Sequence, residues 1–212
     1  MARIPSINEL TQSLKTQGIY QLYNRDVEQR FNLFSKRAMN SFFRNFDNHK
    51  VSKEIMMGKH AKNTTNSLAD GNLFTFLGFD EKKENPVSKL RRLLEASISI
   101  EYKGFENGRV LYVAYFPEWS EIYNETPLEW AEGRSWVRAV EHGVSGMGRY
   151  LYLKSRESAE SRSGKGIQMP NKSKGRVRGG QMRPQKYLSE LRRNFLREVE
   201  GFKNNLVGKR RR

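Results

Sequence analysis

The sequence contains no cysteine, so its 212 residues form neither disulfide bonds nor thiolate metal sites. No apolar run approaches the roughly 20 residues of a transmembrane helix, and the best one, Val110 to Phe116, has the length of a strand. The first residues, MARIP, lack the apolar stretch and small-residue cleavage site of a secretory signal. We therefore expect a chain that folds where it is made and has no membrane partner.

Motifs for metal or phosphate binding are missing as well. The three histidines are scattered, and none has a second histidine at helical spacing, so we expect no metal site. The segment around Gly164-Lys165 is not a phosphate-binding loop, because Ala159 and Gly166 stand where such a loop needs a glycine and a serine or threonine. The sequence therefore predicts no metal, no cofactor and no catalytic residue.

An acidic group between Glu118 and Glu132 is the one hint of acid–base catalysis. Five glutamates lie there, three or four residues apart, and paired carboxylates can transfer protons. They are interleaved with tryptophan and tyrosine, which also suits a solvated face or the rim of a docking surface. Since no serine lies in a G-x-S-x-G motif either, we expect a protein that is not an enzyme.

Positive charge is concentrated at the C-terminal end. The chain has a formal net charge of +16, yet residues 1–144 hold 20 Lys and Arg against 18 Asp and Glu, while residues 145–212 hold 19 against 5. Residues 155–184 have too few apolar side chains to bury a core and are rich in glycine, which predicts an extended basic arm. Such an arm suits a nucleic-acid backbone or a neighbouring protein subunit.

Hydrophobic periodicity predicts helices at both ends of the chain. Apolar residues recur every three or four positions over 18–46, which predicts one long amphipathic helix rich in phenylalanine. A short helix is expected at 86–95, with Pro86 in its first turn. Ser135 is placed to cap another short helix, and helical periodicity returns after Pro184 as a final helix.

Strands are expected in the middle of the chain. The run Leu73 to Phe79 (LFTFLGF) is apolar on both faces and predicts a central strand after a loop at 58–72. Residues 97–102 alternate strictly in polarity, and Asn107-Gly108 favours a turn into a second strand at 109–116. Together they predict a hairpin with a loop of about five or six residues.

These elements predict an α+β fold. A long N-terminal amphipathic helix packs against a small antiparallel β-sheet of three or four strands, followed by an extended basic C-terminal arm and a final helix. The expected boundaries are 1–17 for an N-terminal segment, 18–154 for the α+β core domain, 155–184 for the basic Gly-rich arm, and 185–212 for the C-terminal helix and basic tail.

Four segments follow the Phe-rich helix in an order that is itself informative. They are Asn66–Phe79, Val113–Glu118, Thr126–Trp136 and Arg162–Gln168. Over residues 19–168 this order resembles the neck and tail-completion proteins of tailed bacteriophages, which pair a long N-terminal helix with a small antiparallel sheet. The basic arm and the final helix extend past the compact core of that family.

The resemblance implies a structural virion protein, a subunit of a ring in the head–tail connector. It implies as partners further copies of the chain, neighbouring connector, portal or tail proteins, and genomic double-stranded DNA contacted without sequence specificity. The implied location is the head–tail junction of the virion, after assembly in the host cytoplasm.

Two sets of residues are expected to make these contacts, because aromatic and arginine side chains dominate interface energetics. The expected protein-interface residues are Trp119, Tyr123, Trp130, Arg134 and Trp136. The expected arm contacts, with protein or with the DNA backbone, are Arg162, Lys165, Lys172, Lys174, Arg176 and Arg178.

The alternative is a stand-alone protein that binds nucleic acid without sequence specificity, since the arm's Lys and Arg can neutralise phosphates. No aromatic residue lies between Tyr152 and Tyr187 to stack on bases, which favours an assembly arm over a single-strand binder.

Overall fold

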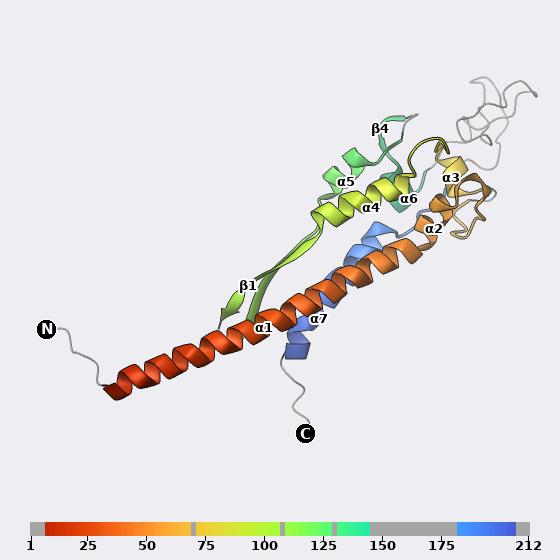
Figure 1. Cartoon of the computed structure of the whole chain (residues 1–212). Coiled ribbons are helices and arrows are strands. Elements are labelled where there is room, and N and C mark those ends of the chain that lie inside the picture. Colours follow the sequence, from red (N-terminus) through yellow and green to blue (C-terminus); the bar gives the residue numbers. More distant parts are fainter. Residues whose placement is uncertain (1–6, 69–70, 107–108, 129–130, 145–181, 207–212) are drawn as a thin grey trace, which may run out of the picture. The chain divides into compact units, whose positions relative to one another are not determined.

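The computed structural model describes residues 7–68, 71–106, 109–128, 131–144 and 182–206 and has the predicted α+β class (Figure 1). The helices are α1 (Ile7–Asn48), α2 (Lys50–Met56), the 3-10 turn η1 (Gly58–His60), α3 (Leu73–Phe76), α4 (Pro86–Ser97), α5 (Trp119–Glu125), α6 (Trp136–His142) and α7 (Leu188–Leu206). The strands are β1 (Ser99–Glu106), β2 (Arg109–Tyr115), β3 (Pro127–Leu128) and β4 (Ala131–Ser135).

The chain divides into two compact units. We call the first the hairpin unit, which comprises residues 1–40, 99–115 and 196–212. We call the second the helical unit, which comprises residues 41–98 and 116–195. Both α1 and α7 contribute residues to each unit, so neither unit is one continuous stretch of sequence. The domain boundaries expected from composition stay a prediction.

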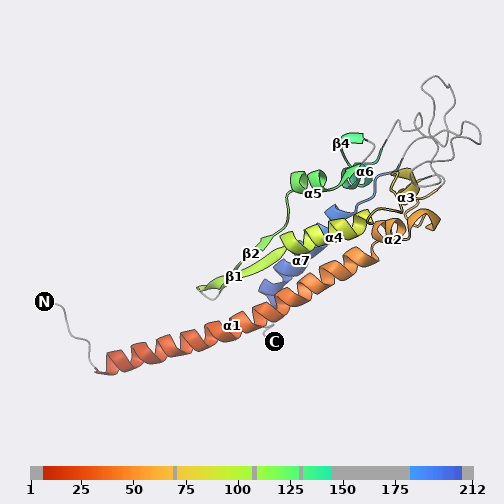
Figure 2. The ribbon, with the colours of Figure 1, turned by 45° about the horizontal axis from the view of Figure 1, so that its top comes forward.

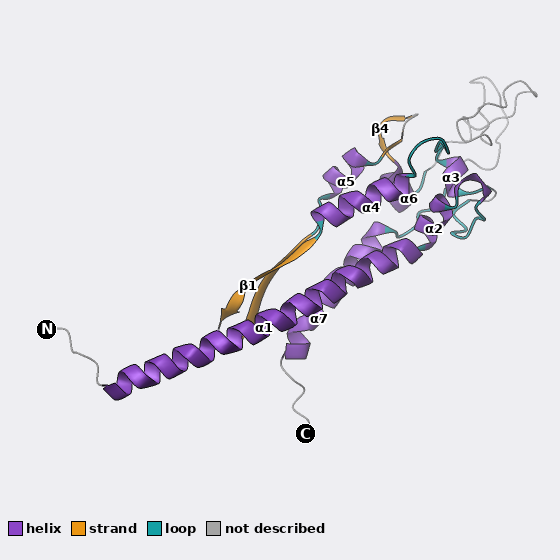
Figure 3. Ribbon diagram, in the orientation of Figure 1, coloured by secondary structure: helices purple, strands orange, loops and turns teal. Residues whose placement is uncertain are grey.

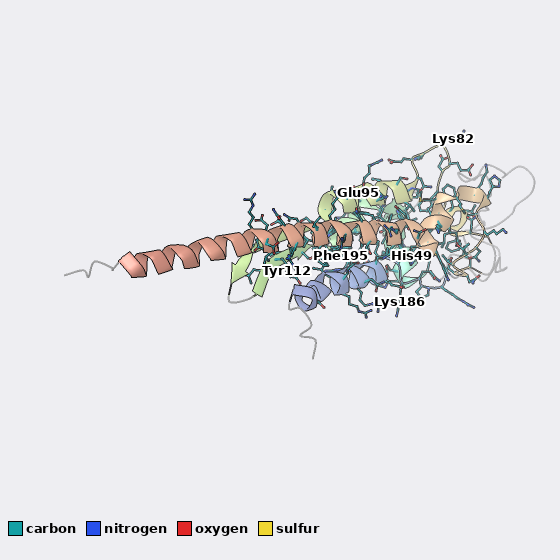
Figure 4. The ribbon with its side chains drawn as sticks, turned by 60° about the horizontal axis from the view of Figure 1, so that its bottom comes forward. His49, Lys82, Glu95, Tyr112, Lys186 and Phe195 are labelled. Atoms are coloured by element: carbon teal, nitrogen blue, oxygen red, sulfur yellow. The ribbon has the colours of Figure 1, made fainter. Side chains whose placement is uncertain are left out.

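In the hairpin unit, β1 and β2 form an antiparallel ladder beside α1 (Figures 1 and 2). The ring of Phe31 on α1 lies 5.5 Å from that of Tyr102 and 5.7 Å from that of Tyr112, centroid to centroid. The Tyr112 hydroxyl, labelled in Figure 4, donates a hydrogen bond of 3.1 Å to the carbonyl of Val199 on α7. The predicted packing of a long helix against a small antiparallel sheet is confirmed.

Several predicted elements are confirmed with longer bounds. Helix α1 begins at Ile7, well before Gly18, and α4 begins at the predicted Pro86. The predicted hairpin is present, but its ladder continues to the pair Glu106 and Arg109. The loop is therefore shorter than expected, because residues 103–106, assigned to it from the sequence, belong to β1.

The strand predicted for residues 73–79 is wrong, because the segment begins with helix α3 (Figure 3). Asn72 caps this helix, and its Oδ1 accepts a hydrogen bond of 2.9 Å from the Thr75 amide. Leu73 and Leu77, four residues apart, are both buried. A short apolar run is equally compatible with a buried strand and a buried helix, and here the asparagine cap was the missed signal.

The sheet is also smaller than the three or four strands expected. Among the described residues, β1 pairs only with β2, and β3 pairs only with β4 (Figure 3). Each ladder has two strands, so both backbone edges of the β1–β2 hairpin lack a strand partner within the described part of the chain.

The core of the helical unit is built mainly from aromatic and aliphatic side chains. Helix α4 packs on α2 and on α5 in this unit (Figure 2). Phe195 of α7 lies with its ring centroid 5.5 Å from Phe42 and 6.5 Å from Phe116 (Figure 4). The largest fully buried side chains of the unit include Phe46, Ile55, Leu73, Leu77, Leu90, Leu94, Ile122 and Leu188.

Glu54 on α2 is fully buried and holds the loop that follows η1. One carboxyl oxygen accepts hydrogen bonds from the Thr65 amide at 2.9 Å and the Thr64 hydroxyl at 3.3 Å. The other accepts from the Leu73 amide at 2.8 Å. One buried side chain thus provides partners for backbone groups of a segment with few apolar residues of its own.

Tyr187 anchors the start of α7 in the helical unit. Its ring lies 5.8 Å from Phe46 and 6.4 Å from Trp136, centroid to centroid. Its hydroxyl forms a buried hydrogen bond of 2.7 Å with the Ser52 hydroxyl. Burial raises the pKa of this phenol, since the charged form would lose its hydration. Tyr187 therefore ties α7 to α1, α2 and α6.

A backbone bridge joins the two described ends that flank residues 145–181. The Val144 amide donates to the Met182 carbonyl at 3.1 Å, and the Met182 amide donates back at 2.9 Å. Gly143 has φ +75°, and a Cβ there would lie 2.7 Å from the Met182 carbonyl oxygen. Only glycine fits this turn without a shift of the backbone.

We predict that Tyr187→Phe lowers the free energy of unfolding by about 1–2 kcal/mol, because the Ser52 hydroxyl loses its buried partner while the ring packing remains. Urea denaturation followed by tryptophan fluorescence measures the change. The control is Tyr115→Phe at an exposed hydroxyl, for which a change within about 0.5 kcal/mol is expected. Equal stability of the Tyr187→Phe and wild-type proteins would contradict the anchor.

We also predict that acidification from pH 7 to pH 5 destabilises the protein through His49. The Nδ1 atom of His49 caps α2 by accepting from the Val51 amide at 3.2 Å. Burial lowers the pKa of His49 from its usual 6.5, so below that pH the unfolded chain binds the proton more readily than the folded one. The contribution is thus present above pH 6.5 and lost as the pH falls through the lowered pKa.

His49→Asn keeps an acceptor at the cap and removes the titration. The urea midpoint of this variant should fall less between pH 7 and pH 5 than that of the wild type. An identical fall in both proteins would exclude His49 as the source.

Candidate interaction surfaces

The first candidate surface lies on β2 in the hairpin unit. Leu111, Val113 and Tyr115 are 40%, 39% and 44% exposed, while Tyr112 between them packs toward α1. This alternation places the three exposed side chains on the outward side of the strand. We call them the hairpin face. Ser99 of β1 pairs with Tyr115, and Glu101 pairs with Val113, so a neighbouring protein would contact both strands here.

Exposed apolar residues are unevenly distributed. Among the described residues, seven large apolar side chains are exposed, and five of them belong to the hairpin unit. Besides the hairpin face, these are Leu33 and Leu196. Single exposed apolar residues are common, but a stripe along one strand of a two-stranded ladder is typical of an interaction surface.

The second candidate surface lies in the helical unit and begins with an aromatic pair on α5. Trp119 and Tyr123 are one helical turn apart and half-buried, with ring centroids 5.7 Å apart. The guanidinium carbon of Arg138 lies 5.8 Å from the Tyr123 ring centroid. Both aromatic residues were predicted from the sequence as interface residues, and the structure adds Arg138 beside them.

Helix α5 is fixed by a reciprocal cap at its start. The side chain of Glu118 accepts from the backbone of the first turn, and the Glu121 carboxylate accepts from the Glu118 amide at 3.1 Å. Glu125 lies 3.8 Å from the Lys89 ammonium group. Glu118, Glu121 and Glu125 of the acidic group thus have partners in the helix cap and in an exposed ion pair.

Helix α6 has two different sides. Trp136, Val137 and Val140 are buried in the core. Arg138 and His142, one turn apart, are exposed on another side of the helix. Ser135 starts the helix as predicted, since its Oγ accepts from the Arg138 amide at 3.2 Å. It also shares a buried hydrogen bond of 2.7 Å with the Thr126 hydroxyl.

The polar side of α6 lines a pocket of about 340 Å³, which we call the arginine pocket. Leu77 and Leu128 contribute buried apolar surface to its lining, and Arg134 comes from the adjoining end of β4. No carboxylate is among the described residues that line it. The described residues of its lining include Leu77, Leu128, Arg134, Arg138, Ala139 and His142.

The other predicted site residues fall in different places. Arg134 is exposed and lines the arginine pocket, as an interface residue requires. Trp136 is 2% exposed and packs against Phe79 and Tyr187, so the expectation of an interface role is corrected to a role in the core. The sequence placed Trp136 in the right helix but did not show which side of that helix is buried.

Several predicted contact residues lie outside the described part of the chain, namely Trp130 and the arm residues Arg162, Lys165, Lys172, Lys174, Arg176 and Arg178. The segment Arg162–Gln168 is outside it too.

Sequence reasoning missed Arg138 and His142. The signal was available, because positions 135, 138, 139 and 142 share one helical face opposite the apolar positions 136, 137 and 140. Among the described residues no group of three or more metal-ligating side chains comes together. No described helix combines the length and the apolar character needed to cross a membrane.

Comparison with protein-family models, with curated proteins and with solved structures gives no match for this chain.

We predict that Ser135→Ala destabilises the helical unit by about 1–2 kcal/mol, because the Arg138 amide loses its cap and the Thr126 hydroxyl loses a buried partner. Chemical denaturation monitored by circular dichroism gives the value. Ser120→Ala, at an exposed position of α5, is the matched control and should change stability by less than about 0.5 kcal/mol. Equal stability of the two variants would contradict a stabilising role of the Ser135 hydroxyl.

Proposed function

We propose that this chain is a structural virion protein, a neck or tail-completion subunit that forms a ring in the head–tail connector of a tailed bacteriophage. Its partners are further copies of itself and neighbouring connector, portal or tail proteins. Its place is the head–tail junction of the virion, after assembly in the host cytoplasm. The proposal rests on the order of sequence segments that resembles this family and on one structural observation.

That observation is the hairpin face. The β1–β2 ladder packs on α1 with one side, whereas its other side carries an apolar stripe and its backbone edges lack a strand partner among the described residues. Another chain that covers this side would bury the stripe and pair an edge. Leu111, Val113 and Tyr115 supply the apolar area, and the edges of β1 and β2 supply unpaired backbone groups. A subunit of a ring needs such a surface, because each copy contacts its neighbour through two different patches.

The charge distribution supports a second contact. Residues 145–212 carry 19 Lys and Arg against 5 Asp and Glu, whereas the rest of the chain is nearly neutral. In a connector that surrounds the genome, such a segment faces either DNA phosphates or an acidic neighbouring protein. The same charge also favours the alternative function, a stand-alone protein that binds nucleic acid without sequence specificity.

The decisive experiment compares assembly with DNA binding. The full chain is expressed alone and together with the portal and tail proteins of its own virus, and its mass is measured by size-exclusion chromatography with light scattering. We expect discrete rings or stable incorporation into a complex. Binding to a duplex oligonucleotide is measured in parallel from about 50 to about 300 mM salt, because affinity from phosphate contacts falls steeply over this range. The proposal is overturned if the protein stays monomeric, does not bind the virus proteins, and binds DNA with a steep salt dependence.

A substitution on the hairpin face links the assembly to the structure. Val113→Glu places a charge on the apolar stripe and should reduce ring formation or incorporation at least about tenfold, because the buried carboxylate would lack a partner. Gln29→Glu adds the same charge at an exposed polar position of α1 in the same unit and should assemble normally. Equal assembly of the two variants would exclude the hairpin face as the contact.

A further inference from the structure

We propose that the arginine pocket binds a short acidic segment of a neighbouring protein, in which carboxylates flank an apolar side chain. This inference names a class of partner for a second surface. It rests on the proposed function in one respect, namely that the partner is a protein of the same assembly. Three observations on the helical unit carry it.

The first observation is unbalanced charge at one cavity. Arg134 and Arg138 both line the pocket, and neither forms an ion pair with a described residue. His142 follows Arg138 by one helical turn and adds a third nitrogen-bearing side chain. Two arginines elsewhere in this unit do have ion-pair partners, since Arg91 pairs with Asp47 and Arg92 pairs with Glu84. The pocket thus gathers two guanidinium groups with no carboxylate in its described lining, and an anion that binds there would neutralise them.

The second observation is the apolar lining between these charges. Leu77 and Leu128 are almost completely buried, and Ala139 adds a methyl group from α6. A volume of about 340 Å³ is at the lower end of the range of pockets that hold small organic groups, so it has room for a large side chain and its neighbours. An apolar side chain fills this lining, while carboxylates reach the guanidinium groups at the rim.

The third observation is the aromatic pair next to the pocket. Arg138 connects the two features, because it lines the pocket and lies over the ring of Tyr123. Trp119 extends the surface by one helical turn. Tryptophan, tyrosine and arginine around a small apolar pocket are the residues that carry most of the energy of protein interfaces.

A nucleic-acid backbone fits this pocket less well than a peptide. Phosphates would satisfy Arg134 and Arg138, but a sugar–phosphate chain presents no apolar side chain to the surface formed by Leu77 and Leu128. An acidic peptide satisfies both parts. We therefore argue for the peptide and leave the DNA duplex as an outcome of the test.

The experiment selects ligands from a displayed library of random 12-residue peptides on the full-length protein. We expect enrichment of sequences in which Glu or Asp flanks Leu, Phe or Trp. The best peptide is then labelled, and its affinity is measured by fluorescence anisotropy. Its Glu→Gln version should bind wild-type protein at least about tenfold more weakly, a comparison that needs no protein variant.

Protein variants locate the binding site. Arg134→Ser with Arg138→Ser should weaken binding at least about tenfold. The control removes the same charge from two exposed arginines of this unit, Arg44→Ser with Arg193→Ser, and should leave the affinity within about twofold. Arg138→Lys keeps the charge and removes the fork of donors, so it should weaken binding to an intermediate degree.

Three results would overturn the proposal. One is the absence of an acidic and apolar consensus among the selected peptides. Another is equal binding by the pocket variant and the charge-matched control. The last is competition by DNA, in which a 20-base-pair duplex displaces the peptide from the wild-type protein. If the duplex also bound the pocket variant more weakly than the charge-matched control, the pocket would be assigned to a phosphate backbone. If rings form but no peptide is selected, the proposed function stands and only this inference is overturned. If peptides are selected but no rings form, this inference stands and the proposed function is overturned.

Discussion

The buried phenol of Tyr187 is the contact on which the helical unit depends. Its ring packs against Phe46 and Trp136, and its hydroxyl reaches Ser52, so one side chain joins α1, α2, α6 and the start of α7. Glu141 strengthens the same junction, because its carboxylate accepts from the amides of Tyr187 and Ser189 at 3.0 and 2.9 Å. An acidic side chain at a helix N-terminus also suits the helix dipole. The return of the chain into α7 is therefore fixed by buried packing and hydrogen bonds together.

The bridge between Val144 and Met182 joins the two described ends of the chain that flank residues 145–181. Both residues belong to the helical unit, and their backbone groups pair in both directions. Among the described residues of this unit, Glu54 is the one charged side chain that is buried, so the rest of the described core is uncharged.

Much of the fold could be predicted because it depends on local patterns. Four such patterns are the Phe-rich stripe of α1, the alternation in β1, Pro86 in the first turn of α4 and the Ser135 cap. Each of them is formed by residues close to one another in the chain. Two failures depend at least in part on contacts between residues distant in sequence. Leu73 to Phe79 is apolar on both faces, and the choice of helix over strand comes with the Asn72 cap and the Glu54 carboxyl group that receives the Leu73 amide. Trp136 was expected at the surface, yet Phe79 and Tyr187, distant in sequence, cover it.

The two candidate surfaces have different chemistry, and this bears on the kind of assembly that they allow. The hairpin face offers aliphatic and aromatic groups beside free backbone edges, whereas the arginine pocket offers cationic groups around a small apolar cavity. Two arginine pockets would repel one another, and pairing of two hairpin faces would leave the pocket charges without partners. A symmetric dimer through one patch would satisfy only one of them. A subunit that meets different neighbours through different patches satisfies both, and this is the arrangement of a ring held between other proteins.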